Sequence, residues 1–143
     1  MAIGFSQVAD PDTTEYRVCR VASQAYTIGD SVMQDRTSDA IDVVPATASS
    51  TTANIYAVAM ETVTSAATQL LTCIIKPTQR WTADVTNTAN TAHGYQRMIL
   101  TDKSTVNNTG TDSTTSSGVF EQLGVVGTTR IVGRFLVVAN ITA

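Results

Sequence analysis

β-branched residues dominate this chain and constrain its fold more than any other feature of the sequence. Threonine contributes 25 residues, valine 16 and isoleucine 9, so 50 of the 143 residues are β-branched. Leucine, a strong helix former, occurs only five times. β-branched side chains lose rotamer freedom in a helix but pack well on a pleated sheet. The composition therefore predicts an all-β protein.

The size and charge of the chain argue against several classes of protein. A chain of 143 residues buries roughly two-thirds of its unfolded surface, which is enough for a hydrophobic core. Its charged residues amount to only 15% and its net charge is −3, whereas a nucleic-acid binder needs a dominant basic surface. The longest apolar runs fall far short of the roughly 18 residues that a membrane span needs. We therefore expect no nucleic-acid partner and no membrane partner.

Short apolar runs separated by turn residues predict the positions of the strands. The segment 54–64 is apolar on both faces, as in a central buried strand, and an Ala-rich helix over 53–71 is the alternative. A turn at Gly29-Asp30 is expected to precede the second strand. The spacing of the runs is typical of a sandwich or a barrel. Strands are expected over 16–21, 31–34, 40–45, 54–64, 70–76, 81–85, 95–101, 119–126 and 131–138.

The first fifteen residues predict an extended N-terminal arm in front of one all-β domain over 16–143. Gly4 and Pro11 interrupt regular structure in this arm, and a chain terminus is poorly ordered unless something holds it. Its apolar residues are therefore expected to be buried on a partner. The alternative is an arm that folds back over one open end of its own barrel. The residues concerned are Ile3, Phe5 and Val8.

Two further segments carry expectations about the surface of the protein. Arg80-Trp81 is the one conspicuous pair of a basic and an aromatic residue, and both types are enriched at protein interfaces. The alternative is a tryptophan that completes the core. The segment 103–118 consists mainly of Ser, Thr, Asn and Gly, so we expect a surface loop that tolerates an insertion between Thr111 and Ser116.

The residues that usually carry catalysis, cofactors or metals form no motif here. His93 is the only histidine, and it has no acidic or thiol residue at ligand spacing and no nucleophile motif near it. Gly124-Val-Val-Gly127 lacks the lysine of a phosphate loop. Cys19 and Cys73 lie in apolar runs and are expected to be buried free thiols, with a disulfide between them as the alternative. We therefore expect no enzyme activity, no cofactor and no metal; a small hydrolase centred on His93 is the opposing hypothesis.

A series of short motifs runs through the chain from about Tyr16 onward. In the first half these are Tyr26-Thr-Ile-Gly29-Asp30-Ser-Val32, Tyr56-Ala-Val58-Ala-Met-Glu61-Thr and Cys73-Ile-Ile-Lys-Pro77. In the second half they are His93-Gly94-Tyr95, Thr105-Val106-Asn107-Asn108, Gly118-Val119-Phe120, Gly124-Val125-Val126-Gly127 and Ile131-Val-Gly-Arg-Phe135. In this order the motifs resemble the small capsid decoration (cement) proteins of tailed bacteriophages. The N-terminal arm is outside the resemblance.

The resemblance implies a non-enzymatic structural protein of the virion, made in the host cytoplasm and bound to the outer surface of the phage head. Such proteins are small β-barrels, tulip-like folds or sandwiches that stabilise contacts between major capsid subunits. The major capsid protein is then the expected partner, with homotrimers favoured and dimers as the alternative. The apolar content of 43% with only 21 charged residues also favours an oligomer. The residues proposed to contact capsid subunits or other copies are Ile3, Phe5, Val8, Arg80 and Trp81.

A receptor- or glycan-binding module displayed on the virion is the alternative function. The polar segment 103–118 is suited to adaptable contacts with a sugar or a receptor. Glycan binders usually expose several aromatic rings, however, and this chain contains only eight aromatic residues, none of them in that segment.

Overall fold

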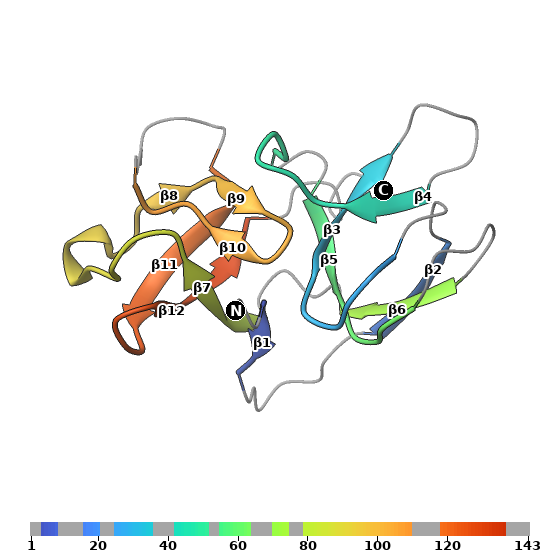
Figure 1. Ribbon diagram of the computed structural model, residues 1–143, viewed down its shortest axis with the longest axis horizontal. Helices are drawn as coiled ribbons and strands as arrows, with labels where there is room; N and C mark the ends of the chain where they lie inside the picture. Colours follow the sequence, from blue (N-terminus) through green and yellow to red (C-terminus); the bar gives the residue numbers. More distant parts are fainter. Residues whose placement is uncertain are drawn as a thin grey trace.

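Two β-sheets make up the fold of the computed structural model (Figure 1), which describes residues 4–8, 16–20, 25–35, 42–51, 55–63, 70–74, 79–109 and 118–136. The prediction of an all-β protein is confirmed, because the described residues form twelve strands and a single 3-10 turn. The first sheet contains β1 (Ser6–Gln7), β7 (Arg80–Val85), β8 (Arg97–Met98), β9 (Leu100–Asp102), β10 (Thr105–Val106), β11 (Phe120–Val125) and β12 (Arg130–Phe135). The second contains β2 (Tyr16–Arg20), β3 (Ser31–Asp35), β4 (Asp42–Pro45), β5 (Ile55–Ala59) and β6 (Leu70–Ile74), and the 3-10 turn is η1 (Thr91–His93).

The first sheet is a nearly closed barrel. Its strands follow the order β8-β11-β12-β7-β10-β9, and the two outermost strands, β8 and β9, are separated in the chain only by Ile99. The predicted final hairpin is confirmed, since β11 pairs antiparallel with β12. One side of β7 pairs with β12, and β1 and β10 share its other side. Closing the sheet in this way leaves few exposed strand edges.

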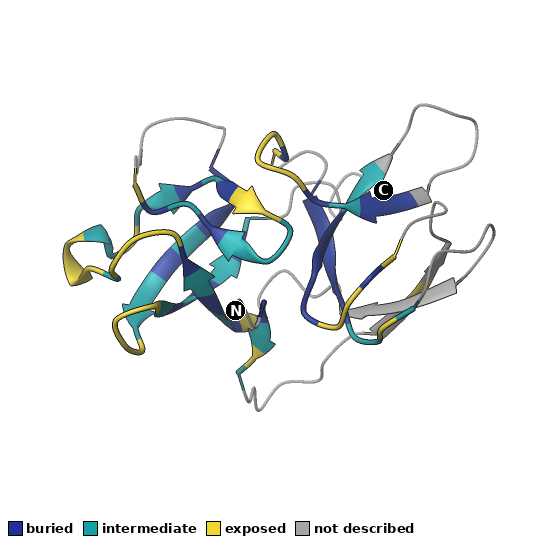
Figure 2. Ribbon diagram, viewed as in Figure 1, coloured by how far each residue is buried: buried dark blue, intermediate teal, exposed yellow. Residues whose placement is uncertain are grey.

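The second sheet is antiparallel, in the order β2-β6-β5-β3-β4, and it curls so that β2 and β4 approach each other. Within the predicted strand 54–64, the central strand β5 covers Ile55–Ala59, and the helix considered as the alternative is wrong, because none of the described residues 55–63 is helical. Every residue of β5 is buried, as Figure 2 shows. In the register of β2 and β6, Cys19 lies opposite Leu71 and Cys73 opposite Arg17. The prediction of free thiols concerns side chains outside the described part of the structure.

Strand β5 is buried on both faces because it separates two apolar clusters. Ile55 and Val58 belong to the larger cluster, which fills the barrel. Tyr56 and Ala57 belong to the smaller one, inside the second sheet, where the Tyr26 hydroxyl donates to the Val43 carbonyl at 2.9 Å. A register shift between β3 and β5 accompanies this division of the strand between two cores. The larger cluster thus takes residues from both sheets.

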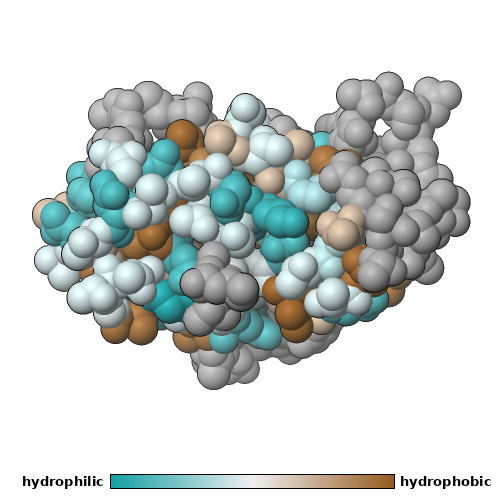
Figure 3. All heavy atoms as spheres, in the orientation of Figure 1, coloured by the Kyte–Doolittle hydropathy of each residue, from teal (hydrophilic) through white to brown (hydrophobic). Residues whose placement is uncertain are grey.

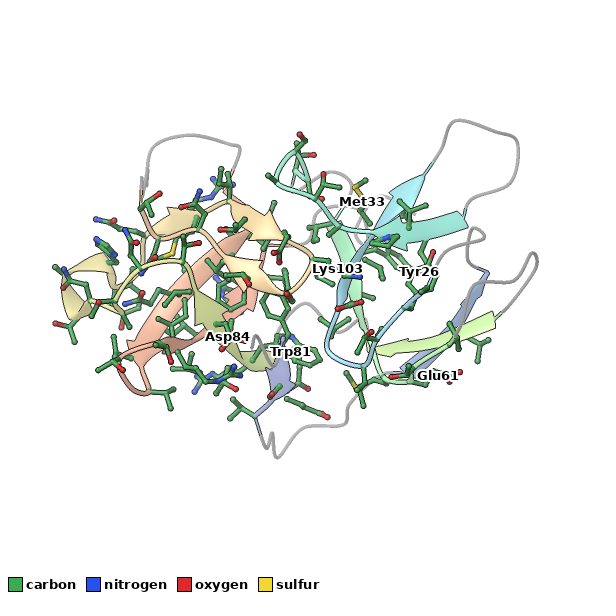
Figure 4. The ribbon with its side chains drawn as sticks, viewed as in Figure 1. Tyr26, Met33, Glu61, Trp81, Asp84 and Lys103 are labelled. Carbon is green, nitrogen blue, oxygen red and sulfur yellow. The ribbon has the colours of Figure 1, made fainter. Side chains whose placement is uncertain are left out.

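The expected turn at Gly29-Asp30 is present, and it joins the second sheet to the barrel. Gly29 has a φ of 93°, a left-handed conformation that glycine adopts without steric cost. The buried carboxylate of Asp30 accepts the Thr27 amide at 2.9 Å and lies 3.3 Å from the Lys103 ammonium. Lys103 extends from the barrel toward the second sheet (Figure 4), and its carbonyl accepts the amide of Ser31 at 2.7 Å. One ion pair and a set of backbone bonds therefore connect the two sheets.

The N-terminal segment differs from the predicted free arm. Residues 6 and 7 form β1, which pairs antiparallel with β7, and the Phe5 side chain is only 2% exposed. Its ring packs against the rings of Phe120 and Phe135, with centroid distances of 5.6 and 4.7 Å. The alternative of an arm folded back onto its own domain is therefore what residues 4–8 adopt. The physical reason is that β7 has a free edge that this segment completes.

Two other expectations about strands and loops need correction. The expected single strand over 95–101 is split into β8 and β9, with Tyr95 in a left-handed conformation before them. The segment 103–118 is not one surface loop, since Thr105–Val106 forms β10, which runs parallel to β7, and Val106 is fully buried. The proposed insertion site at 111–116 lies outside the described residues.

Gly133 leads to a first testable prediction about the barrel. It lies at an inward position of β12, where a Cβ atom would come within 2.2 Å of the Glu121 carbonyl oxygen and 2.4 Å of the Phe120 ring. We expect Gly133→Ala to lower the free energy of unfolding by about 1–3 kcal/mol, because neither neighbour can move without disturbing the β11–β12 pair. Urea denaturation measures this change. Gly127→Ala is the control, since a Cβ there meets nothing within 4 Å; equal stability of the two variants would contradict the prediction.

Candidate functional site

The structure separates the five interface candidates into different environments. Phe5 and Trp81 are each 2% exposed inside this chain, so the proposal that these side chains contact a partner is corrected: both belong to the core. Val8 is half-buried, its amide donating to the Arg80 carbonyl at 3.0 Å. Arg80 is exposed, and Ile3 lies outside the described residues. Arg80 is thus the one candidate of the five whose described side chain is open to a partner.

The alternation of side chains along β7 explains why the adjacent residues Arg80 and Trp81 differ in burial. Successive side chains of a strand point to opposite faces, so Trp81 enters the barrel while Arg80 faces outward. The same alternation buries Gln122 in β11 and leaves Glu121 on the outer face. The outer face of the barrel is therefore where a partner would meet this part of the chain.

A row of charged residues crosses this outer face. Arg80 pairs in register with Arg134, Arg134 with Glu121, and Glu121 with Arg97. The Nε atom of Arg134 donates to Glu121 Oε1 at 2.9 Å, and Arg97 donates to the Gly118 carbonyl at 2.9 Å. Among the described residues, none accepts a hydrogen bond from the Arg80 guanidinium. Glu121 therefore compensates one of the two neighbouring arginines Arg80 and Arg134, and one positive charge remains.

Three residues of this row, Arg80, Glu121 and Arg134, line a shallow depression of about 480 Å³ on the surface of the barrel. We call it the Tyr95 surface. Leu123 supplies an apolar side chain to it and is the extra residue of a β-bulge between Gln122 and Gly124. Bulges commonly redirect a side chain at functional sites. The residues that line the Tyr95 surface are Arg80, Tyr95, Glu121, Leu123 and Arg134.

Tyr95 is displayed by a turn that is itself well fixed. Its side chain is 74% exposed and its φ is 64°, the only positive φ of a non-glycine residue among those described. The backbone amide of Tyr95 donates to the backbone carbonyl of Gln122 at 2.7 Å. The side-chain Nε2 of Gln122 in turn donates to the backbone carbonyl of Asn90 at 2.8 Å. Asn90 also caps η1 by accepting the Ala92 amide at 2.8 Å. The buried Gln122 and the exposed Asn90 thus hold the backbone that carries this ring.

His93 lies in the same turn, with its ring nitrogen Nδ1 turned away from solvent. Its Nδ1 atom is buried without a hydrogen-bond partner in this part of the chain, so no acid orients the imidazole there. Within the described ranges, no group of three or more His, Cys, Asp or Glu residues is arranged to hold a metal ion. Nor does any helix in those ranges have the length and hydropathy to cross a membrane.

A second depression, of about 330 Å³, lies where the barrel meets the second sheet. It is largely apolar and is lined by Phe5, Ser6, Gln7, Ile28, Gly29 and Met60. Ile28 is 54% exposed on its rim. None of its described lining residues is charged, so the chemistry they offer is less specific than that of the Tyr95 surface.

Sequence reasoning identified one residue of the Tyr95 surface, Arg80, and missed the other four. The signal for Glu121 and Arg134 was present, because the predicted hairpin pairs its two strands and alternation puts both residues on one face. The signal for Tyr95 was only its position after Gly94 in a turn. Comparison with family models, curated proteins and solved structures finds no match to this chain.

Proposed function

We propose that this protein is a non-enzymatic structural protein of a virion that binds the outer surface of a phage head and strengthens contacts between major capsid subunits. The observation that carries the proposal is the Tyr95 surface, an exposed tyrosine beside an arginine with no partner among the described residues. Tyr and Arg dominate the energetics of protein interfaces. The motif series from Tyr16 onward supports the choice of a capsid as the partner.

The mechanism of such a protein is linkage between binding and assembly. A protein that binds the assembled lattice and not the free subunits stabilises the lattice by mass action. A nearly closed barrel suits this role, because few exposed strand edges are left to pair with other chains. On the face seen in Figure 3, hydrophobic and hydrophilic residues are interspersed over the described part of the chain. A homotrimer, or alternatively a dimer, is part of the proposal.

Binding to purified heads tests the proposed function. We expect the protein to co-sediment with expanded, undecorated heads in a saturable manner, at a fixed number of copies per head. Dissociated capsid subunits are the control, and we expect them to bind far more weakly because they lack the seams between capsomers. Saturable binding to free subunits alone, or no binding to heads, would contradict the proposal.

The receptor- or glycan-binding alternative has less support on this surface. Sugar sites usually stack the ligand on several exposed rings, whereas the described aromatic side chains other than Tyr95 are at most 7% exposed. Those buried side chains are Phe5, Tyr26, Tyr56, Trp81, Phe120 and Phe135.

A further inference from the structure

Tyr95 carries a conformational cost that burial of its own side chain does not offset. A left-handed backbone disfavours a bulky side chain by roughly 1–2 kcal/mol, and glycine or asparagine normally takes such a position. With 74% of its side chain exposed, Tyr95 gains little from burial in return. Strained backbone of this kind is concentrated at functional sites, where the surrounding structure enforces it.

The surroundings of Tyr95 do enforce this conformation. Besides the bond to Gln122, three backbone hydrogen bonds of 3.1 Å tie the turn together, from His93 to Asn90, from Gly94 to Thr91 and from Gln96 to His93. Gln122 is fully buried, so the acceptor of the Tyr95 amide sits on a rigid strand. The ring is therefore held out toward solvent before any partner binds. A contact residue ordered in advance loses less entropy on binding than a flexible one.

The charges beside the ring indicate what kind of partner fits. Arg80 and Arg134 are directly opposite each other on β7 and β12, and like charges in that position repel. Glu121 already pairs with Arg134, and that ion pair is partly exposed, with side-chain accessibilities of 43% for Arg134 and 19% for Glu121. A carboxylate from a partner would relieve the repulsion and give Arg80 a bidentate acceptor.

We propose that the Tyr95 surface is a preorganised docking site for an acidic segment of a partner protein. The Tyr95 ring packs on the segment together with Leu123, and Arg80 pairs with one of its carboxylates. The inference rests on the proposed function in one respect, since a capsid subunit is taken as the source of the acidic segment. It assigns Tyr95 as the main contact, which the resemblance to decoration proteins does not.

A protein carboxylate fits this surface better than a nucleic acid does. Glu121 lies between Arg134 and Arg97 in the charged row and would repel a chain of phosphates. The protein as a whole has a net charge of −3, whereas nucleic-acid binding depends on extended positive surface. A single carboxylate needs only the local excess of positive charge at Arg80.

Substitutions at Tyr95 and Arg80 test the docking site on heads. Tyr95→Gly relieves the backbone cost, so we expect an unchanged or higher melting temperature together with a loss of affinity of about tenfold or more. Tyr95→Asn, which also tolerates the left-handed region, gives the same expected result if the glycine variant folds poorly. Tyr95→Phe keeps the ring and should retain affinity. Arg80→Glu should weaken binding and reduce its dependence on salt.

Val126→Ala is the matched control, because Val126 is 57% exposed at the far end of the β11–β12 hairpin. We expect it to bind heads like the unchanged protein. The inference is overturned if Tyr95→Gly or Tyr95→Asn, folded and stable, binds heads as tightly as the unchanged protein. It is also overturned if both substitutions destabilise the free protein, since the ring would then have a structural role.

If the unchanged protein does not bind heads, the proposed function is refuted but the docking site is not. A second experiment therefore tests the docking site without heads. A short glutamate-rich peptide is titrated into isotope-labelled protein, with a lysine-rich peptide of equal length as the control. We expect amide shifts to change at Tyr95, Leu123 and Arg134 with the acidic peptide only. No change there, or a larger change with short single-stranded DNA, would overturn the inference.

Discussion

Replacing Phe5 with alanine is expected to lower the free energy of unfolding by about 3–5 kcal/mol. The ring is 2% exposed and closes a cluster with Phe120 and Phe135, whose own rings lie 5.1 Å apart in an edge-on arrangement. Its removal leaves a cavity between rings that are fixed on paired strands and cannot collapse into it. Thermal denaturation should show a fall in melting temperature on the order of 10 °C.

The same experiment decides between the two accounts of the N-terminal segment. Val126→Ala again serves as the control, and an exposed truncation of this kind changes stability by about 0.5 kcal/mol or less. Deleting residues 1–12 removes Phe5 and β1 together, so it too should destabilise the free protein. A free protein with the stability of the intact chain after either change would restore the account of an independent, partner-binding arm.

Replacing Asp84 with alanine is expected to cost about 3 kcal/mol of stability, because it leaves a largely buried guanidinium without its counter-charge. Asp84 Oδ1 accepts from Arg130 at 2.7 Å, and the two side chains are only 15% and 17% exposed. Asp84 Oδ2 also accepts the Gly4 amide at 3.1 Å. Arg130 in turn donates to the Thr82 hydroxyl at 2.8 Å and to the Gly4 carbonyl at 3.3 Å. The ion pair therefore holds the N-terminal segment on the barrel (Figure 4 shows Asp84 on β7).

Two comparisons make the Asp84 result specific. Glu121→Ala breaks the Arg134–Glu121 pair on the outer face of the barrel, and because Arg134 is 43% exposed we expect a loss of only about 0–1 kcal/mol in urea denaturation. The double variant of Phe5→Ala and Asp84→Ala should lose less than the sum of the single changes, since both release the same segment. Strict additivity would indicate that Asp84 does not act through residues 4–8.

The sequence by itself determined the class of fold and most of the strand positions. The preference of β-branched residues for strands, the alternation of apolar residues and the preference of certain residues for turns each depend on a few neighbouring residues. They can therefore be recognised in a short stretch of sequence. This is why β5, the Gly29-Asp30 turn and the final hairpin lie where the sequence predicts them. It also explains the errors in the predicted strand 95–101 and at β10, where the strands are short and depend on pairing with distant residues.

The N-terminal segment depended on tertiary structure in the same way. Gly4, with a φ of 82°, is locally unfavourable for a strand, yet the free edge of β7 and the Asp84–Arg130 pair stabilise one beside it. Contacts across about eighty residues of sequence override local preference, and no pattern within residues 1–15 reveals them.

The candidate site shows the same division between local pattern and long-range geometry. The sequence marked Arg80 and Trp81 together as interface candidates, and the structure separates them into a surface residue and a core residue. The bulge at Leu123 sets the register in which Glu121 lies opposite Arg134, and the predicted hairpin does not contain it. Only the closed barrel sets Arg80 beside Arg134, because β7 and β12 are about fifty residues apart in the chain. Only the tertiary structure sets the left-handed conformation of Tyr95, because the Gln122 carbonyl that holds its amide belongs to another strand. Local patterns of hydrophobicity thus decided which residues form strands, and long-range strand pairing decided which side chains meet on the surface.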